Sequence, residues 1–361
     1  MRLHQLRLEN LRAFPRLELD LQPGWNVFVG PNGAGKTTLL EAAYLLSHAR
    51  SFRPGPKDSL VRHGAPGFSI YGRLQPAGPE TAPIGVGIAR ASGRLEARVD
   101  GAEIAIAELL RHAAVVCFDP GSHELIAGPA ELRRRFLDWG VFHVEPDFLG
   151  TWRTFQRALR QRNALLRSGG QGAELDAWDN EFAQSGTTLA SMRARYLENL
   201  RPELAAELSR LLPELGAVQI SEDRGWATQA TLAEHLAATR DDDLRRGFSG
   251  SGPQRADWTI AFERAPRREH LSRGQEKLCA LAAVLAQARV FSEQHGEWPI
   301  VCIDDLASEL DTPHQEGLVR SLHGVDAQIL VTGTHRPQAL VEAGLAAAWF
   351  HVDPGQVAAL L

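Results

Sequence analysis

The feature that most constrains the fold of this chain is a glycine-rich octapeptide near its start, which matches the pattern G-x-x-x-x-G-K-[ST] at every fixed position. The residues before it, Trp25 to Val29, predict a short strand, and the residues that follow, Thr37 to Ala49, predict a helix. A glycine-rich turn between a strand and a helix is the setting in which this pattern forms a phosphate-binding loop. The sequence therefore predicts an α/β fold that binds a nucleoside triphosphate.

Each part of the octapeptide suits the binding of a triphosphate. Its glycines let consecutive backbone N–H groups converge on phosphate oxygens. Lys36 can reach the β- and γ-phosphates, and the Thr37 hydroxyl is placed to ligate Mg²⁺. The expected nucleotide-binding residues are Gly30, Pro31, Asn32, Gly33, Ala34, Gly35, Lys36, Thr37 and Thr38.

A pair of acidic residues follows a second apolar run, far along the chain. Ile300 to Ile303 predict a buried strand that ends in Asp304 and Asp305, at the strand end where α/β folds bind ligands. Such a pair is often only a turn or a helix cap, and the phosphate loop is what favours a functional interpretation. We expect Asp304 to hold Mg²⁺ with Thr37, and Asp305 to orient the attacking water. Lys36, Asp304 and Asp305 form the expected catalytic set.

Composition excludes several classes of protein. Of the 361 residues, 44% are hydrophobic and 23% are charged, which suits a folded chain of about two domains. The formal net charge of -5 argues against a protein that coats nucleic acid through its overall charge, so any DNA binding must come from a local basic patch. The start of the chain lacks an apolar leader and no apolar run could cross a membrane, so we expect a cytoplasmic protein without a membrane partner.

The pattern of apolar residues divides the chain into three segments. Alternating runs punctuated by glycine and proline predict antiparallel strands in the first third. From Glu131 the period becomes helical, and two apolar stripes on either side of the break Ser168 to Gly172 predict an antiparallel hairpin, although two ordinary core helices would show the same stripes. The last third alternates between helices and strands. We expect an N-terminal part with the phosphate loop and antiparallel strands at residues 1–130, a helical arm at 131–215 and a C-terminal α/β part at 216–361.

A short polar motif precedes a long predicted helix, about thirty residues before the acidic pair. In the run Leu271-Ser-Arg-Gly-Gln-Glu276, Ser272 is well placed to cap a helix from Ser272 to His295. A capped helix start alone would explain this run. Together with the phosphate loop and the acidic strand, however, it resembles the signature of ATP-binding-cassette ATPases. In that superfamily the signature loop of one subunit closes on the nucleotide of another, which implies an ATP-dependent homodimer.

Several longer stretches narrow the resemblance to the RecF family of bacterial recombination mediators. They occur in the family's order over nearly the whole chain, and they are Leu8–Phe14, Arg50–Arg53, Arg133–Asp138, Leu159–Leu166, Gly252–Asp257, Leu271–Lys277 and Asp304–Asp311. The resemblance implies a P-loop NTPase of the ABC/SMC head type with a short inserted, coiled-coil-like arm. Some positions depart from the family's pattern. Relatives usually have Pro followed by an acid and later Gly-x-Pro, where this chain has Pro120-Gly121 and Gly128-Pro129-Ala130, and Gln254 stands where relatives usually have histidine.

The resemblance also implies a function. Similar proteins are weak, DNA-stimulated ATPases that dimerise on double-stranded or gapped DNA with ATP and Mg²⁺, and that act with RecR and RecO in replication, recombinational repair and the SOS response to help load a recombinase. By this likeness, Ser272, Arg273, Gly274 and Gln275 would contact the γ-phosphate in the partner subunit. Ser308 to Asp311 would form the loop between the two sites. Thr334 or His335 would lie near the γ-phosphate as a switch, although a lone histidine after a strand is more often a surface residue.

One predicted helix carries a local excess of positive charge. No acidic residue occurs from Phe148 to Ala173, while five arginines do. Arg153, Arg157 and Arg160 are the candidate DNA contacts, with Arg162 and Arg167 as further positive charges. Such a face could follow phosphates without reading bases, although an arginine-rich helix is usually only solvated.

Two other functions fit parts of this pattern. The ATPase subunit of a membrane transporter would share the phosphate loop, but the long interval before the signature, the inserted helices and Asp305 in place of glutamate argue against it. An SMC-like chromosome organiser would carry much longer coiled-coil arms. Binding to gapped DNA without a membrane partner separates the first alternative from the repair function, and arm length separates the second.

Overall fold

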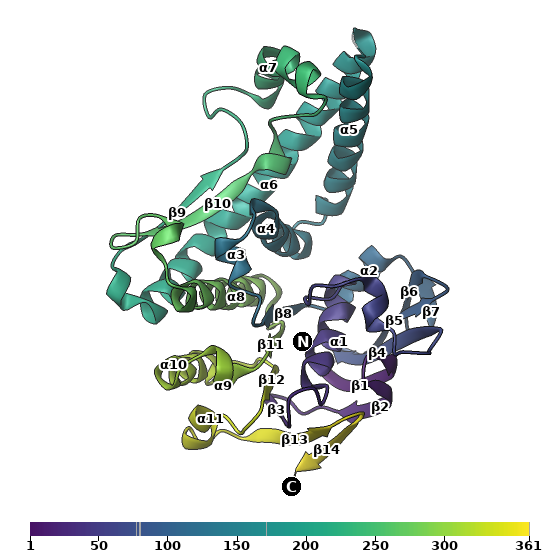
Figure 1. Cartoon of the computed structure of the whole chain (residues 1–361), viewed down its shortest axis with the longest axis vertical. Coiled ribbons are helices and arrows are strands. Elements are labelled where there is room, and N and C mark those ends of the chain that lie inside the picture. Colours follow the sequence, from purple (N-terminus) through teal and green to yellow (C-terminus); the bar gives the residue numbers. More distant parts are fainter. Residues whose placement is uncertain (77, 79–80, 171, 361) are drawn as a thin grey trace. The chain divides into compact units, whose positions relative to one another are not determined.

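The computed structural model describes residues 1–76, 78, 81–170 and 172–360. It divides into two compact units, of which the first comprises Met1–Ser122 and Gln287–Leu361 and the second His123–Ala286 (Figure 1). The fold is of the mixed α/β type that was predicted for an ATPase head. The predicted domain boundaries at residues 130 and 215 stay a prediction.

A six-stranded sheet forms the centre of the first unit. Its strand order is β14-β13-β3-β12-β11-β8, and all neighbours are parallel except β14 and β13. The strands are β3 (Trp25–Val29), β8 (Val115–Phe118), β11 (Ile300–Ile303), β12 (Ile329–Gly333), β13 (Ala347–Asp353) and β14 (Gln356–Leu360). Every residue of β3, β11 and β12 is buried, as expected for parallel strands covered on both faces.

Helices cover both faces of this central sheet. Helix α1 (Lys36–His48) lies on one face, and α9 (Leu306–Glu309), α10 (Thr312–Leu322) and α11 (Gln338–Glu342) lie on the other (Figure 1). Ten residues of α1 are buried, because the helix lies between the central sheet and the second sheet of this unit. The phosphate loop is therefore fixed at both ends, by a buried strand and by a buried helix.

The second sheet of this unit is antiparallel throughout, as the alternating runs predicted. Its order is β2-β1-β4-β5-β6-β7. The strands are β1 (Arg2–Leu11), β2 (Phe14–Asp20), β4 (Gly67–Gln75), β5 (Ile84–Ala91), β6 (Arg94–Val99) and β7 (Ala102–Ile104), and the short helices η1 (Lys57–Leu60) and α2 (Ile106–His112) accompany them. In β4, buried residues alternate with more exposed ones, which is the pattern of a sheet with one face towards the core.

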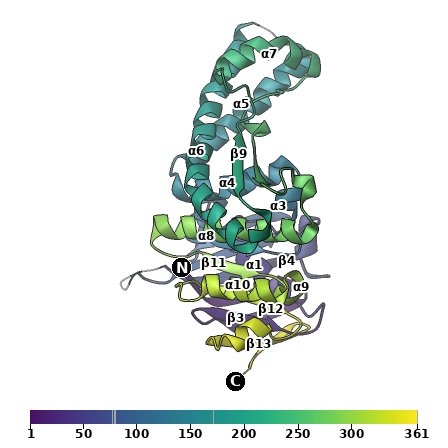
Figure 2. The same cartoon turned by 90° about the vertical axis from the view of Figure 1, so that its left-hand side faces the viewer.

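Consecutive helices form the arm of the second unit. They are α4 (Ala130–Val144), α5 (Phe148–Ser168) and α6 (Ala173–Leu211), and α5 and α6 lie side by side in both views (Figures 1 and 2). The predicted helical hairpin is therefore confirmed, with Gly169 ending α5 in the left-handed conformation. Gln171, within the predicted break, lies outside the described residues. The rings of Phe155 and Phe182 meet across the hairpin with centroids 5.1 Å apart.

Smaller elements complete the second unit. Strands β9 (Val218–Asp223) and β10 (Asp257–Phe262) form an antiparallel pair, and α7 (Leu232–Arg246) packs against α5 and α6. The short helices are α3 (Glu124–Ala127), η2 (Pro213–Leu215), η3 (Pro253–Arg255) and η4 (Arg268–His270), and α8 (Arg273–His295) begins in this unit. Within the described residues, no helix combines the length and the apolar character needed to cross a membrane.

Two details of the predicted arm are wrong. The helical spacing of Trp152, Phe155, Leu159, Asn163 and Leu166 predicts that Trp152 lies on the apolar stripe of α5, but Trp152 is 36% exposed. Arg162 was counted with the exposed positive charges, but it is fully buried. Both errors arise because the buried face of α5 is defined by Phe155, Ala158, Arg162 and Leu166, and a helical stripe does not show that an arginine finds carboxylates inside the unit.

Two glycines of the second unit test its packing. A Cβ on Gly140 in α4 would lie 2.0 Å from Cζ of Tyr196 in α6, whereas a Cβ on the exposed Gly150 in α5 would touch nothing within 4 Å. Gly140→Ala should therefore lower the free energy of unfolding by about 1–3 kcal/mol. Gly150→Ala should raise it by about 0.5–1 kcal/mol, because alanine favours the helix. Chemical denaturation measures both, and equal effects would contradict this packing.

Candidate functional site

The phosphate loop requires glycine for reasons that the structure makes explicit. A Cβ on Gly30 would lie 2.1 Å from the carbonyl oxygen of Val352 in the adjacent strand β13, so no side chain fits there. Gly33 and Gly35 have φ values of 80° and 108°, which favour glycine. A Cβ on Gly35 would also lie 2.8 Å from the ring of Phe14, which belongs to the predicted family motif Leu8–Phe14. The phosphate loop therefore packs against Phe14 and is also fixed at both ends by β3 and α1.

Lys36 closes the loop on itself. Its Nζ donates hydrogen bonds to the carbonyl oxygens of Gly30 and Pro31, at 2.8 and 2.9 Å. Burial lowers the pKa of the amine, while the nearby carboxylates of Asp305 and Asp304 raise it. The cation is thus held over the loop, where the predicted phosphates would offer it stronger, negatively charged acceptors.

The two halves of the predicted metal site meet directly. The Thr37 hydroxyl lies 3.0 Å from both carboxylate oxygens of Asp304, although 267 residues separate them in the sequence. A hydroxyl and a carboxylate are the hard oxygen donors that Mg²⁺ prefers. The described residues contain no group of three or more His, Cys, Asp or Glu side chains that could hold a metal ion by themselves. The donor set therefore fits Mg²⁺ only if phosphate oxygens and water supply the remaining ligands.

Thr332 is a site residue that the sequence analysis missed. It is fully buried in β12, which lies between β3 and β11 in the sheet. Its hydroxyl donates to Oδ1 of Asp304 at 2.6 Å and accepts from the backbone N–H of Asp305 at 2.8 Å. One hydroxyl therefore orients both acidic residues. No motif marks this threonine, and only the strand order shows it.

Two carboxyl groups at this edge of the sheet, those of Asp304 and Asp119, lie in surroundings that disfavour negative charge. Burial raises the pKa of Asp304, and so does the neighbouring Asp305, while hydrogen bonds from Thr332 and Thr37 oppose the rise. Asp305 has a left-handed backbone, with φ 54°, and its Oδ1 is buried without a hydrogen-bond partner among the described side chains and backbone. Asp119, just after β8, also has a raised pKa, chiefly through burial. A cation at this edge would relieve the repulsion between these carboxylates.

An ion pair that the sequence did not reveal ties the phosphate-loop helix to the antiparallel sheet. Glu41 in α1 is fully buried, and Arg12 pairs with it through two nitrogens, with Nη2 2.6 Å from Oε1. The Ser51 hydroxyl donates to the same carboxylate. Arg12 lies in the tight turn after β1, with φ 48°. Because Phe14 follows this turn and packs under Gly35, the turn supports the loop at two points.

The structure brings the candidate switch residues to the phosphate loop. Thr334 and His335 follow β12 directly, and the N–H of Gly30 lies 3.4 Å from the carbonyl oxygen of Gly333. Thr334 is half-buried and His335 is exposed. The predicted loop Ser308 to Asp311 ends at the cap of α10, where Asp311 accepts a hydrogen bond from the N–H of His314. The role of Thr334 or His335 as a switch near the γ-phosphate stays a prediction.

The signature motif forms the capped helix start that was predicted. The Ser272 hydroxyl accepts a hydrogen bond from the N–H of Gln275 at 3.3 Å, and the N–H of Ser272 donates to Oε1 of Gln275 at 3.0 Å. Ser272, Arg273 and Gly274 are exposed. The contact of this motif with a second subunit stays a prediction.

The candidate DNA residues Arg153, Arg157 and Arg160 are exposed on α5, and Arg157 is paired with Glu181 at 2.5 Å.

Thr332 can be tested as a positioning residue. Thr332→Val keeps the shape of the side chain but removes the hydroxyl, so we expect ATP hydrolysis to slow roughly 10- to 100-fold because both aspartates lose their orientation. Thr332→Ser should restore most of the rate. Ser47→Ala is the matched control, since Ser47 is buried in the same unit and its hydroxyl accepts from the backbone of Val115 in β8. Equal rates in Thr332→Val and Ser47→Ala would contradict this role.

Comparison with known proteins shows the family of this chain. The family model of the RecF/RecN/SMC N-terminal domain matches residues 2–355. The DNA replication and repair protein RecF of Stenotrophomonas maltophilia is 45% identical over 364 residues, which cover 100% of both chains. That of Erwinia tasmaniensis is 35% identical, over 99% of each chain.

Solved structures show the same relationship. The recombination mediator protein RecF-ATP in RecFOR pathway superposes with a TM-score of 0.88 at 25% identity, covering 99% of this chain and 97% of that one. An Smc head bound to the C-winged helix domain of ScpA has a TM-score of 0.61 at 14% identity, and therefore shares the fold alone. The family match and the identity over the full length show that this chain belongs to the RecF family of DNA replication and repair proteins, with the head fold that RecF shares with SMC proteins.

Proposed function

We propose that this chain is an ATP-controlled DNA-binding protein of replication, recombinational gap repair and the SOS response. Two copies join on duplex or gapped DNA when ATP is bound, and they help to load a recombinase. Slow, DNA-stimulated ATP hydrolysis then resets the dimer. The observation that carries the proposal is the contact of Thr37 with Asp304 beneath an intact phosphate loop, in a chain whose relatives are DNA replication and repair proteins.

The residues of the loop have separate tasks in this proposal. The N–H groups from Gly30 to Thr38 bind phosphate oxygens, and Lys36 leaves its two carbonyl partners to bind the β- and γ-phosphates. Thr37 and Asp304 would hold Mg²⁺, which supplies positive charge to the β- and γ-phosphate oxygens when bound. Thr332 keeps Asp304 in place through its hydrogen bond.

Asp305 is the residue that would act on water. Its buried Oδ1 has no hydrogen-bond partner among the described residues, so it is available as an acceptor. Accepting from the attacking water would orient the oxygen towards the γ-phosphorus. A single copy of the chain would still lack donors on the far side of that phosphate. The capped start of α8, with its exposed Ser272 and Gly274, offers such donors to an anion.

The partners follow from the same proposal. The solved relative belongs to the RecFOR pathway, so we propose RecO- and RecR-type mediator proteins as partners of this chain. In this proposal, the slow hydrolysis of ATP sets how long the dimer stays on DNA.

The dimer can be tested by sedimentation of the full chain with ATP or ADP, with and without duplex DNA. Wild type should dimerise only with ATP, and Lys36→Arg should weaken ATP binding and with it the dimer. Ser272→Arg should bind ATP but remain a monomer, because a large cation replaces the small cap. Thr187→Arg, at an exposed position of α6, is the matched control. An ATP-dependent dimer of Ser272→Arg as stable as that of the control would contradict the shared site.

The basic face of α5 can be tested by the salt dependence of DNA binding. Replacing Arg153, Arg157 and Arg160 by alanine should weaken duplex binding and lower the slope of log K against log salt by about 0.9 for each phosphate that is no longer neutralised. Arg157 should contribute least, because Glu181 already neutralises it. A triple variant of Arg16, Arg62 and Arg94, which are exposed in the first unit, removes the same charge. If both triple variants change the slope equally, α5 is not the binding face.

A further inference from the structure

The loop between α7 and β10, residues 247–256, receives an unusual concentration of polar contacts. Most of them come from three of the family-like stretches recognised in the sequence, namely Arg133–Asp138, Leu159–Leu166 and the loop's own Gly252–Asp257, and Arg193 and Asp243 add others. All of these residues belong to the second unit. We call residues 247–256 the arm loop. It is not part of the ATP site.

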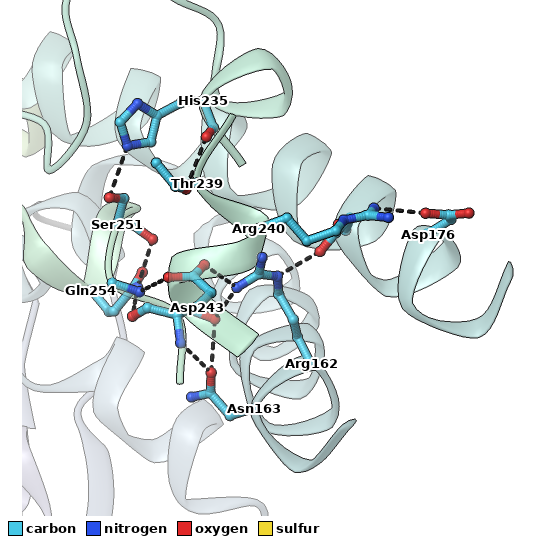
Figure 3. Close-up of polar contacts among 12 residues, drawn as sticks. Arg162, Asn163, Asp176, His235, Thr239, Arg240, Asp243, Ser251 and Gln254 are labelled. Carbon is cyan, nitrogen blue, oxygen red and sulfur yellow. Dashed lines mark hydrogen bonds and ion pairs between the residues drawn. The ribbon is translucent and has the colours of Figure 1, made fainter. Parts of the chain in front are cut away.

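One side of the arm loop is fixed by α5 and α7 (Figure 3). Arg162 is fully buried and donates to Asp179 at 2.5 Å, to Asp243 at 2.8 Å and to the Ser249 hydroxyl at 2.7 Å. Asn163 accepts from the N–H of Ser249 at 2.7 Å. Asp243 also accepts from the N–H of Gly250 at 2.9 Å. The backbone of the arm loop is thus bound to two helices that are distant in the sequence.

The other side of the arm loop is fixed by α4 and α6. Arg193 donates to the carbonyl oxygen of Pro253 at 2.8 Å. Arg134 donates to the carbonyl oxygen of Ala256 at 2.7 Å. Arg133 binds the carboxylate of Asp257 through two nitrogens, at 2.6 and 3.0 Å. Three arginines therefore hold the end of the loop where β10 begins.

This arrangement favours a fixed loop shape over stability. Buried ion pairs add little stability compared with apolar side chains of similar volume, because the charges lose their hydration. What they do specify is geometry, since each guanidinium accepts only certain directions of approach. A loop that is already ordered loses less conformational entropy when it binds a ligand. The network therefore holds the backbone of the arm loop in one shape, and the side chains that take no part in the network can contact a ligand.

The side chains left over are an aromatic ring and three guanidinium groups. Phe248 is 40% exposed, and the Arg255 guanidinium lies 5.6 Å from its ring centroid. Arg246 and Arg167 lie within 3.2 Å of the positions that a Cβ would take on Gly250 and Gly247. In the part of the chain that the structure describes, none of these three arginines forms an ion pair, whereas the nearby Arg245 is paired with Asp242.

The same positive charge continues along α5. Arg153, Arg160 and Arg167 are seven residues apart, so they lie nearly in line along the helix, over a length of about 21 Å. All three are exposed, and Arg167 ends the row beside Gly247 of the arm loop. The row and the loop thus form one basic track that ends at an exposed aromatic ring.

We propose that the arm loop binds DNA where a duplex passes into a single strand. Arg167, Arg246 and Arg255 bind backbone phosphates, and Phe248 stacks on the first base that no longer has a pair. A basic track with an exposed aromatic side chain matches the chemistry of unpaired nucleic acid, because every base has a face that can stack and a phosphate beside it. The inference rests on the proposed DNA-binding function and adds to it the element that recognises a gap.

The test compares two DNA molecules, a blunt duplex and the same duplex with a single-strand gap that carries 2-aminopurine at the junction. Affinities are measured on the full chain with ATP. Phe248→Ala should weaken binding to the gapped DNA roughly 5- to 100-fold and leave the blunt duplex unchanged, since the stacking on one base is removed. Phe248→Trp should keep the affinity and the quenching of 2-aminopurine. Arg255→Ala should weaken binding to both molecules.

Val341→Ala is the matched control, because Val341 is an exposed apolar residue of the first unit, at 55% exposure. If wild type binds neither DNA, the proposed function itself fails. If wild type prefers the gapped DNA and Phe248→Ala keeps that preference, the arm loop does not recognise the junction. A Phe248→Ala variant that keeps both affinities but does not form the ATP-dependent dimer would show instead that the ring contacts a second copy of the chain, which also overturns the proposal.

Discussion

The nucleotide site depends on how one carboxylate is held. Asp304 accepts hydrogen bonds from Thr37 at the start of α1 and from Thr332 on β12, so it joins the phosphate loop to two buried strands. The carboxylate is buried and its pKa is raised, chiefly by desolvation, while the hydrogen bonds from these two hydroxyls and the charge of Arg53 oppose the rise. The packing of Phe14 under Gly35 and the Arg12–Glu41 ion pair support the phosphate loop and α1, which carry Thr37.

Sequence reasoning predicted the parts of this site that consist of contiguous residues. The strand β3, the phosphate loop and the start of α1 follow from one octapeptide and its flanks, and β11 follows from an apolar run that ends in two acids. Thr332 could not be predicted, because its role depends on β12 lying between β3 and β11. Arg12 and Glu41 were missed for a similar reason, since neither residue matches a catalytic pattern and their contact depends on the packing of a turn against a helix.

The arm shows where helical periodicity misleads. The hairpin of α5 and α6 follows from spacing alone, yet spacing placed Trp152 on the buried stripe, and the buried Arg162 was counted among the positive charges of a face that could follow phosphates. The arginine is buried because Asp179 and Asp243 lie 17 and 81 residues further along the chain, and no local pattern contains that information. The arginines of α5 therefore differ in their surroundings. Arg162 is buried and binds the arm loop, whereas Arg153, Arg160 and Arg167 are exposed.

The hydrogen bonds of Lys36 have a consequence for any substitution at this position. Because Nζ donates to the carbonyl oxygens of Gly30 and Pro31, the lysine joins the start of α1 to the first two residues of the phosphate loop. The same side chain thus supplies a positive charge and closes the turn of the backbone. A variant without the ammonium group would lose both at once, so a loss of nucleotide binding in it would have two physical causes.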